Sequence, residues 1–154
     1  MKKFDINELK TMAQKIREDI VTMINKAGSG HPGGSLSSVE LLTYLYFYRM
    51  NHDPKNPDKP DRDRFILSKG HCGPAQYAAL AEAGYFDREI LWTLRDIDSI
   101  LQGHPDMNKT PGIEMTTGSL GQGISHGVGM ALAAKRNKQD YKVYVLLGDG
   151  EIQE

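Results

Sequence analysis

The chain has 154 residues, with 19 lysines and arginines against 20 aspartates and glutamates, so its formal net charge at pH 7 is -1. A hydrophobic fraction of 39% and a charged fraction of 25% are typical of one soluble globular domain and exclude an intrinsically disordered chain. Because the charge is balanced and no basic cluster occurs, the sequence has no electrostatic feature that would recruit nucleic acid or an anionic membrane.

The sequence also argues against a membrane-spanning helix, a signal peptide and an internal disulfide. The longest nearly apolar stretch, residues 41–48, is far shorter than the roughly 20 residues that a membrane-spanning helix needs. Polar residues between Asp5 and Lys10 occupy the place where the apolar core of a signal peptide would follow. The single cysteine, Cys72, agrees with a reducing compartment and is interpreted as a small buried side chain. We therefore expect a cytoplasmic protein.

Two helices are expected in the first third of the chain. Asp5 followed by Glu8 predicts a capping box, and apolar residues at three- and four-residue spacing extend the helix to about residue 27, where Gly28 stops it. Ser37 followed by Glu40 predicts a second start, for a helix that ends near residue 50. Three prolines and alternating charges predict a surface connector over residues 51–63.

The rest of the chain alternates strands and helices. We expect a strand over residues 64–68, a helix over 75–83, and one or two helices over 87–101. Residues 142–147 are rich in β-forming apolar side chains, which is typical of a parallel strand covered on both faces. The pattern predicts a doubly wound α/β domain over residues 1–154, with a mainly parallel sheet and helices on both faces.

Glycine and histidine mark the candidate site. Three of the five histidines directly follow glycine, namely His31, His71 and His104, and a histidine on such a loop can donate a hydrogen bond to a phosphate or hydroxyl. The alternative is an ordinary solvent-exposed loop histidine. No His or Cys pair has the spacing of a zinc site. Glycines cluster in two regions, and the face formed by Gly123, Gly127 and Ala131 predicts close helix packing. The two regions contain Gly28, Gly30, Gly33 and Gly34, and Gly118, Gly121, Gly123, Gly127 and Gly129.

The sharpest local signal is Gly148-Asp149-Gly150, which directly follows the predicted strand at 142–147. Ligands of open α/β sheets bind at the carboxyl ends of strands. The glycines let the backbone approach a diphosphate, and Asp149 offers an oxygen ligand to a bridging Mg²⁺. The alternative is a simple turn capped by the aspartate. No P-loop and no dinucleotide-binding glycine motif is present.

Five segments in order resemble transketolase, above all the bacterial forms that are split into N- and C-terminal subunits. They are residues 29–36 (SGHPGGSL), 62–71 (RDRFILSKGH), 103–105 (GHP), 116–125 (TTGSLGQGIS) and 148–154 (GDGEIQE). The resemblance covers nearly the whole chain and implies the thiamin diphosphate-binding fold, with this domain incomplete at its C-terminus.

The resemblance also implies a role for each matching residue. It makes His31 and His104 catalytic contacts of the sugar substrate and His71 a ligand of the cofactor's phosphate. The segment Gly118, Ser119 and Leu120 would lie beside the thiamin ring, although Ser119 replaces a proline common there. Asp149 and Gly150 would form the metal and diphosphate site, and Glu154 would belong to a proton network across the subunit interface.

The implied activity is that of the pentose phosphate pathway enzyme: transfer of a two-carbon ketol unit from a ketose phosphate to an aldose phosphate, with thiamin diphosphate and Mg²⁺. The chain lacks the family's pyrimidine-binding and C-terminal domains and the remaining metal ligands, so we expect it to be inactive without a partner subunit in a homo- or hetero-oligomer. Two alternatives remain: half of a related thiamin enzyme such as deoxyxylulose-phosphate synthase, and a non-catalytic remnant that binds a partner.

Overall fold

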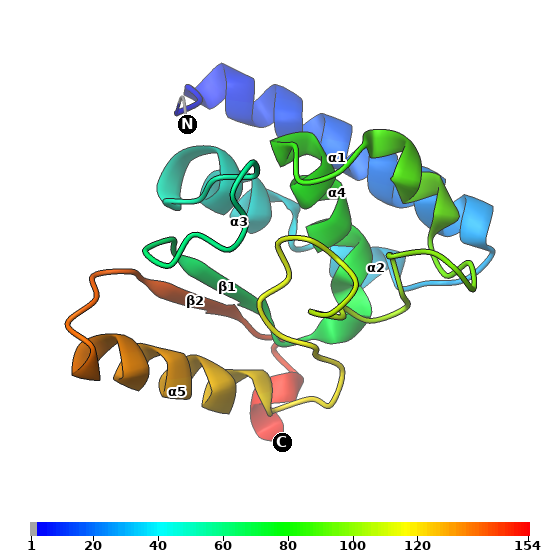
Figure 1. Ribbon diagram of the computed structural model, residues 1–154. Helices are drawn as coiled ribbons and strands as arrows, with labels where there is room; N and C mark the ends of the chain where they lie inside the picture. Colours follow the sequence, from blue (N-terminus) through cyan, green and yellow to red (C-terminus); the bar gives the residue numbers. More distant parts are fainter. Residues whose placement is uncertain (1–2) are drawn as a thin grey trace.

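The first long helix has the ends that the sequence predicts. In the computed structural model, which describes residues 3–154, α1 runs over Ile6–Ala27 (Figure 1). The Asp5 carboxylate accepts the backbone N–H groups of Asn7 and Glu8, and the Glu8 carboxylate accepts the N–H of Asp5 at 2.8 Å. Gly28 closes the helix in the left-handed conformation, with φ of 65°. The predicted capping box and glycine stop are both confirmed.

The second predicted helix starts differently. Two short helices, α2 (Pro32–Leu36) and α3 (Val39–Tyr44), precede a π-helical turn, η1 (Leu45–Arg49). The predicted capping box at Ser37 is wrong, because the hydroxyls of Ser37 and Ser38 both donate to the carbonyl of Gly34 at 2.9 Å. Glu40 instead pairs with Arg17 of α1. The expected end near residue 50 is confirmed.

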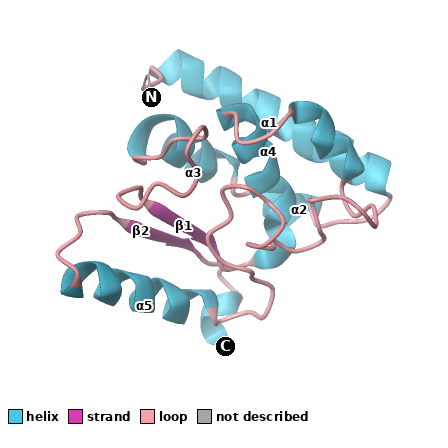
Figure 2. Cartoon of the chain, viewed as in Figure 1, coloured by secondary structure: helices cyan, strands magenta, loops and turns pink. Residues whose placement is uncertain are grey.

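The sheet is parallel and covered on both faces. Strand β1 (Arg64–Leu67) pairs with β2 (Val143–Leu146) in register from Arg64 opposite Val143 to Leu67 opposite Leu146. One face carries Phe65, Leu67, Tyr144 and Leu146 into the core built by α1, α3 and α4. The other face meets α5 (Gly123–Arg136), so Figures 1 and 2 show the sheet between two helical layers. The α/β prediction is confirmed, although β2 is only half-buried along its length.

Close approach of α5 to the sheet depends on glycine. A Cβ atom at Gly127 would overlap the Cγ2 of Val145, and one at Gly123 would overlap the Ser68 hydroxyl oxygen. Ala131 is exposed and does not belong to this face; the buried alanine is Ala134, seven residues after Gly127. At about 100° per residue, Gly127 and Ala134 lie about 40° and about 20° around the helix from Gly123, whereas Ala131 lies about 80° away.

The central helix follows β1 directly. A 3-10 turn, η2 (Gly70–Cys72), leads into α4 (Gly73–Ala83), which is buried along most of its length and ends at Gly84 with φ of 92°. The predicted helix over 75–83 therefore begins two residues earlier. The predicted helices over 87–101 are reduced to a 3-10 segment, η3 (Arg88–Thr93), because Arg95 adopts φ of 70°, which no right-handed helix allows. Of the described helices, none is long and apolar enough to cross a bilayer.

His52 is a buried histidine of the connector, and it gives the fold a pH dependence. Its Nε2 donates to the carbonyl of Tyr46 at 2.6 Å, so its Nδ1 accepts the hydroxyl of Tyr85 at 3.0 Å. Burial lowers the pKa of His52 below the ordinary 6.5. The unfolded chain therefore binds a proton first as the pH falls below about 6.5. We expect the free energy of unfolding to decrease from pH 7 to pH 5, and less steeply in His52→Gln, as measured by urea titration at each pH. Equal slopes for the two proteins would contradict this assignment.

Candidate active site

The structure brings together the three Gly-His loops that the sequence marks as candidates, although the sequence pattern did not predict that they meet. His31 precedes α2, His71 lies in η2 after β1, and His104 lies in the loop after η3. The rings of His31 and His71 meet edge to face with centroids 5.1 Å apart. His104 contacts the next glycine segment, since a Cβ atom at Gly118 would lie 3.0 Å from its Cδ2. Three loops that are distant in sequence thus form one cluster of imidazoles.

Glycine allows these loops to approach. A Cβ atom at Gly70 would lie 2.7 Å from the carbonyl carbon of Thr117, so the loop that carries Gly118 packs directly on η2. A Cβ atom at Gly34 would lie 2.6 Å from the Sγ of Cys72. Cys72 is fully buried, as expected, and burial raises the pKa of its thiol. The glycines before His71 and after His31 therefore have a steric role in assembling the cluster.

The electrostatics keep two of the imidazoles neutral. Burial, with His31 and Lys69 adding to it, lowers the pKa of His71. Burial and the nearby Arg95 guanidinium lower the pKa of His104. At neutral pH both rings therefore have one donor and one acceptor nitrogen, which suits contacts to hydroxyl groups and the relay of a proton.

Two cations border the histidines, and the sequence reasoning missed both. The Nζ of Lys69 donates to the carbonyl of Gly34 and to the Ser37 hydroxyl, each at 3.3 Å. Nη1 of Arg95 donates to the Ser29 hydroxyl at 3.2 Å. Lys69 directly precedes the Gly70-His71 pair, so its position in the sequence could have indicated that it belongs to the site. Arg95 is placed by its left-handed backbone, for which the sequence carries no signal. The cations make the cluster suitable for an anionic ligand.

The Gly148-Asp149-Gly150 turn lies where the sequence predicts, directly after β2. Asp149 is exposed and has no hydrogen bond or ion pair within residues 3–154. A Cβ atom at Gly150 would meet open space, so the backbone there is accessible to a ligand. Within the same described range, no three His, Cys, Asp or Glu side chains are grouped to hold a metal. Asp149 therefore offers one oxygen ligand and not a complete metal site.

A buried carboxylate follows this turn, and no sequence pattern indicated it. Glu151, in the 3-10 turn η4 (Glu151–Gln153), accepts the N–H of Gly121 at 3.1 Å, the N–H of Gly148 at 2.9 Å and the hydroxyl of Ser68. Burial alone would raise its pKa, but these hydrogen bonds outweigh burial and lower it. Glu151 is therefore ionised at neutral pH.

The remaining predicted residues lie on the same loops. Gly118 and Ser119 line a cavity of about 250 Å³, together with Thr116, Thr117, Gln122, Gly123 and His126. Leu120 is exposed, next to them in the chain. Glu154 is exposed and packs against the loop, since a Cβ atom at Gly121 would lie 2.8 Å from the Cβ of Glu154. Within residues 3–154, Glu154 makes no hydrogen bond or ion pair with the three histidines.

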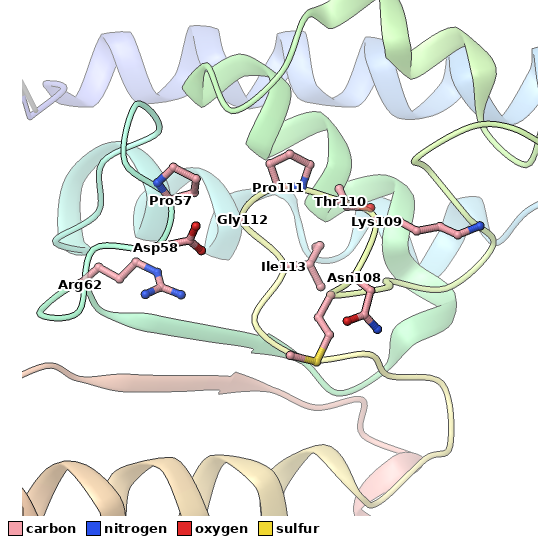
Figure 3. Close-up of a pocket in the computed structure, with 10 residues that line it drawn as sticks. Pro57, Asp58, Arg62, Asn108, Lys109, Thr110, Pro111, Gly112 and Ile113 are labelled. Carbon is pink, nitrogen blue, oxygen red and sulfur yellow. The ribbon is translucent and has the colours of Figure 1, made fainter.

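A second cavity, of about 260 Å³, lies between the connector and the loop that precedes the glycine segment (Figure 3). None of the predicted site residues lines it. The guanidinium of Arg62, which lines this cavity, already forms an ion pair with the Glu114 carboxylate, with an N–O distance of 2.8 Å. We therefore assign the candidate site to the histidine cluster and not to this cavity.

Comparisons with known proteins identify the family. Residues 8–154 match the family described as "Transketolase, thiamine diphosphate binding domain". The chain is 49% identical to a subunit of the apulose-4-phosphate transketolase of Phocaeicola vulgatus, covering 95% of this chain and 52% of that protein. It is 52% identical to the 6-deoxy-6-sulfo-D-fructose transketolase subunit SqwG of a Clostridium species, covering 96% and 54%.

Solved structures of transketolases also resemble this chain. The crystal structure of Campylobacter jejuni transketolase superposes with a TM-score of 0.91 at 37% identity, over 98% of this chain and 25% of that one. The chain thus spans about half the length of the two subunits and a quarter of the longer enzyme. The chain belongs to the transketolase family, and residues 8–154 match its thiamine diphosphate binding domain.

Proposed function

We propose that this chain is the diphosphate-binding part of a split transketolase. Together with a C-terminal subunit that carries the pyrimidine-binding domain, it transfers a two-carbon ketol unit from a ketose phosphate to an aldose phosphate. The observation that carries the proposal is the convergence of His31, His71 and His104, with Asp149 and Gly150 at the end of the neighbouring strand. The relatives named as transketolase subunits support the need for a partner.

The residues present fit thiamin diphosphate. The His71 imidazole and the accessible backbone at Gly150 would hold its diphosphate, and the exposed Asp149 carboxylate would offer an oxygen ligand to Mg²⁺. The cavity lined by Gly118 and Ser119, with the exposed Leu120 next to them in the chain, would provide a surface for the thiamin ring. When bound, the cofactor supplies the carbanion chemistry.

The chain's own residues would hold and orient the sugar. Neutral His104 binds a hydroxyl or carbonyl oxygen of the donor, and exposed His31 binds a hydroxyl and moves a proton. Glu154, next to Gly121, would face the partner chain and take part in proton transfer across the interface. We place this reaction in the cytoplasm, in the pentose phosphate pathway or a related sugar phosphate route.

Reconstitution tests the proposal. The protein is mixed with the parts of a split transketolase that it does not span, namely the remainder of the N-terminal subunit and the C-terminal subunit, together with Mg²⁺ and thiamin diphosphate. Ketol transfer is then measured with a panel of donors. The panel contains ketose phosphates, apulose 4-phosphate, 6-deoxy-6-sulfofructose and the donor of deoxyxylulose-phosphate synthase. We expect transfer from at least one ketose donor, and a loss of about a hundredfold in His31→Ala.

The outcomes separate the alternatives. Activity only with the synthase donor would identify a related thiamin enzyme, although the Gly103-His104-Pro105 segment favours transketolase. A complex that forms normally but transfers nothing, with the native protein and His31→Ala alike, would identify a partner-binding remnant and reject the proposal.

A further inference from the structure

Glu151 joins three segments that are far apart in the sequence. Its side chain comes from η4 and is buried, with 4% of the residue exposed. One carboxylate oxygen accepts the Ser68 hydroxyl and the N–H of Gly121 at 3.1 Å, and the other accepts the N–H of Gly148 at 2.9 Å. Within residues 3–154, no other carboxylate accepts hydrogen bonds from all three segments.

Each of these donors lies within three residues of a proposed cofactor residue. Ser68 directly follows β1 and lies three residues before His71. Gly121 directly follows Leu120, and Gly148 directly precedes Asp149. The Glu151 carboxylate therefore fixes the separation between the phosphate ligand, the ring-facing loop and the metal ligand.

The arrangement requires two acceptor oxygens. A carboxylate has two oxygens that both accept, whereas a glutamine amide has one oxygen that accepts and an NH₂ group that only donates. In Glu151→Gln, either the N–H of Gly121 or that of Gly148 would face an NH₂ group and lose its partner. An aspartate is shorter by one methylene group and would not reach both backbone segments.

We propose that Glu151 is a positioning residue of the thiamin diphosphate site, which holds the loops at Gly121 and Gly148 and the end of β1 at the separation that the cofactor requires. The inference rests on the proposed function. Glu151 itself is buried, and it would act through the three segments that it holds and not as a ligand of the cofactor.

Equilibrium binding tests the proposal. Thiamin diphosphate is titrated by calorimetry, at saturating Mg²⁺, into the assembled apo-enzyme with its C-terminal subunit. Because hydrogen bonds to charged groups are the stronger ones, we expect Glu151→Gln to weaken binding about tenfold. Glu151→Asp keeps the charge and should restore at most part of this loss. Gln153→Ala changes an exposed side chain of the same turn and should bind as the native protein does.

Further readouts separate positioning from a general loss of stability. At saturating cofactor, we expect the kcat of Glu151→Gln to stay within about threefold of native. Ser68→Ala removes a single donor and should weaken binding less than Glu151→Gln; in the double variant the two effects should not add. If Glu151→Gln does not assemble, Ser68→Ala alone still tests the binding constant.

Native affinity in Glu151→Gln or, where that variant fails to assemble, in Ser68→Ala would overturn the inference and leave the proposed function intact. A native complex that does not bind thiamin diphosphate would instead reject the proposed function.

Discussion

Asp149→Asn is expected to lower ketol transfer by the assembled enzyme by at least about a hundredfold at limiting Mg²⁺. The substituted amide would keep one acceptor oxygen but lose the negative charge, and hard divalent cations prefer carboxylate ligands. Changes to residues that only support a metal ligand already cost about 10- to 100-fold in affinity, so loss of a ligand itself should cost no less. The measurement is the Mg²⁺ concentration that gives half-maximal activity, together with the midpoint of thermal unfolding.

Asp149→Asn should leave the fold unchanged, so a loss of activity can be attributed to weaker Mg²⁺ binding. Asp149 is exposed and has no hydrogen bond or ion pair within residues 3–154, so its replacement removes no structural contact there. Asp140→Asn is the matched control, because Asp140 is an exposed carboxylate just before β2, at the opposite end of the strand. Full activity of Asp149→Asn at the native Mg²⁺ requirement would show that Asp149 is not the metal ligand.

Local signals in the sequence were sufficient for the elements that depend on neighbouring residues. The ends of α1 follow from Asp5, Glu8 and Gly28, whose interactions span only a few residues. The apolar composition of residues 142–147 predicted a strand of a parallel sheet, which is confirmed, whereas its pairing with β1 was not predicted. The predicted start at Ser37 failed because the Gly34 carbonyl, within α2, accepts the hydrogen bond of the same hydroxyl.

The site residues also divide into those that a local sequence pattern indicates and those that depend on distant partners. His31, His71 and His104 were found because each follows a glycine, and the structure brings them together. Glu151 was missed because its partners, Gly121 and Ser68, lie 30 and 83 residues away and two of its three donors are backbone N–H groups. No pattern of residue types in the sequence predicts such hydrogen bonds. The cofactor and catalytic roles themselves stay predictions, and the reconstitution and Asp149 experiments test them.

Arg88→Ala is expected to cost about 3 kcal/mol in the free energy of unfolding at pH 7. Arg88, in η3, pairs with Asp19 of α1 at 2.5 Å and with Glu82 of α4 at 3.3 Å, so it joins three elements of the core. Asp19 is fully buried. Removing one partner of a buried pair costs about 3–5 kcal/mol, because the other charge is left without compensation. The lower end applies here because the Arg88 side chain is 40% exposed.

The pH dependence identifies the cause. Burial raises the pKa of Asp19 above 3.8 even with Arg88 present, and the Arg88 hydrogen bond opposes that rise. Without Arg88 the pKa should rise further, so Asp19 becomes protonated as the pH falls and the buried charge disappears. The loss of stability should therefore be largest at neutral pH and smaller toward pH 4, as followed by urea unfolding and circular dichroism.

Two comparisons decide whether the buried charge is responsible. Arg17→Ala removes a pair with Glu40, whose side chain is 66% exposed, and should cost at most about 1 kcal/mol. In an Asp19→Asn background, Arg88→Ala should cost much less than in the native protein, since no buried charge is then left behind. An undiminished cost in that background would mean that Arg88 stabilises the fold by packing its stem against Trp92, whose ring centre lies 5.1 Å from the guanidinium carbon, and not by compensating Asp19.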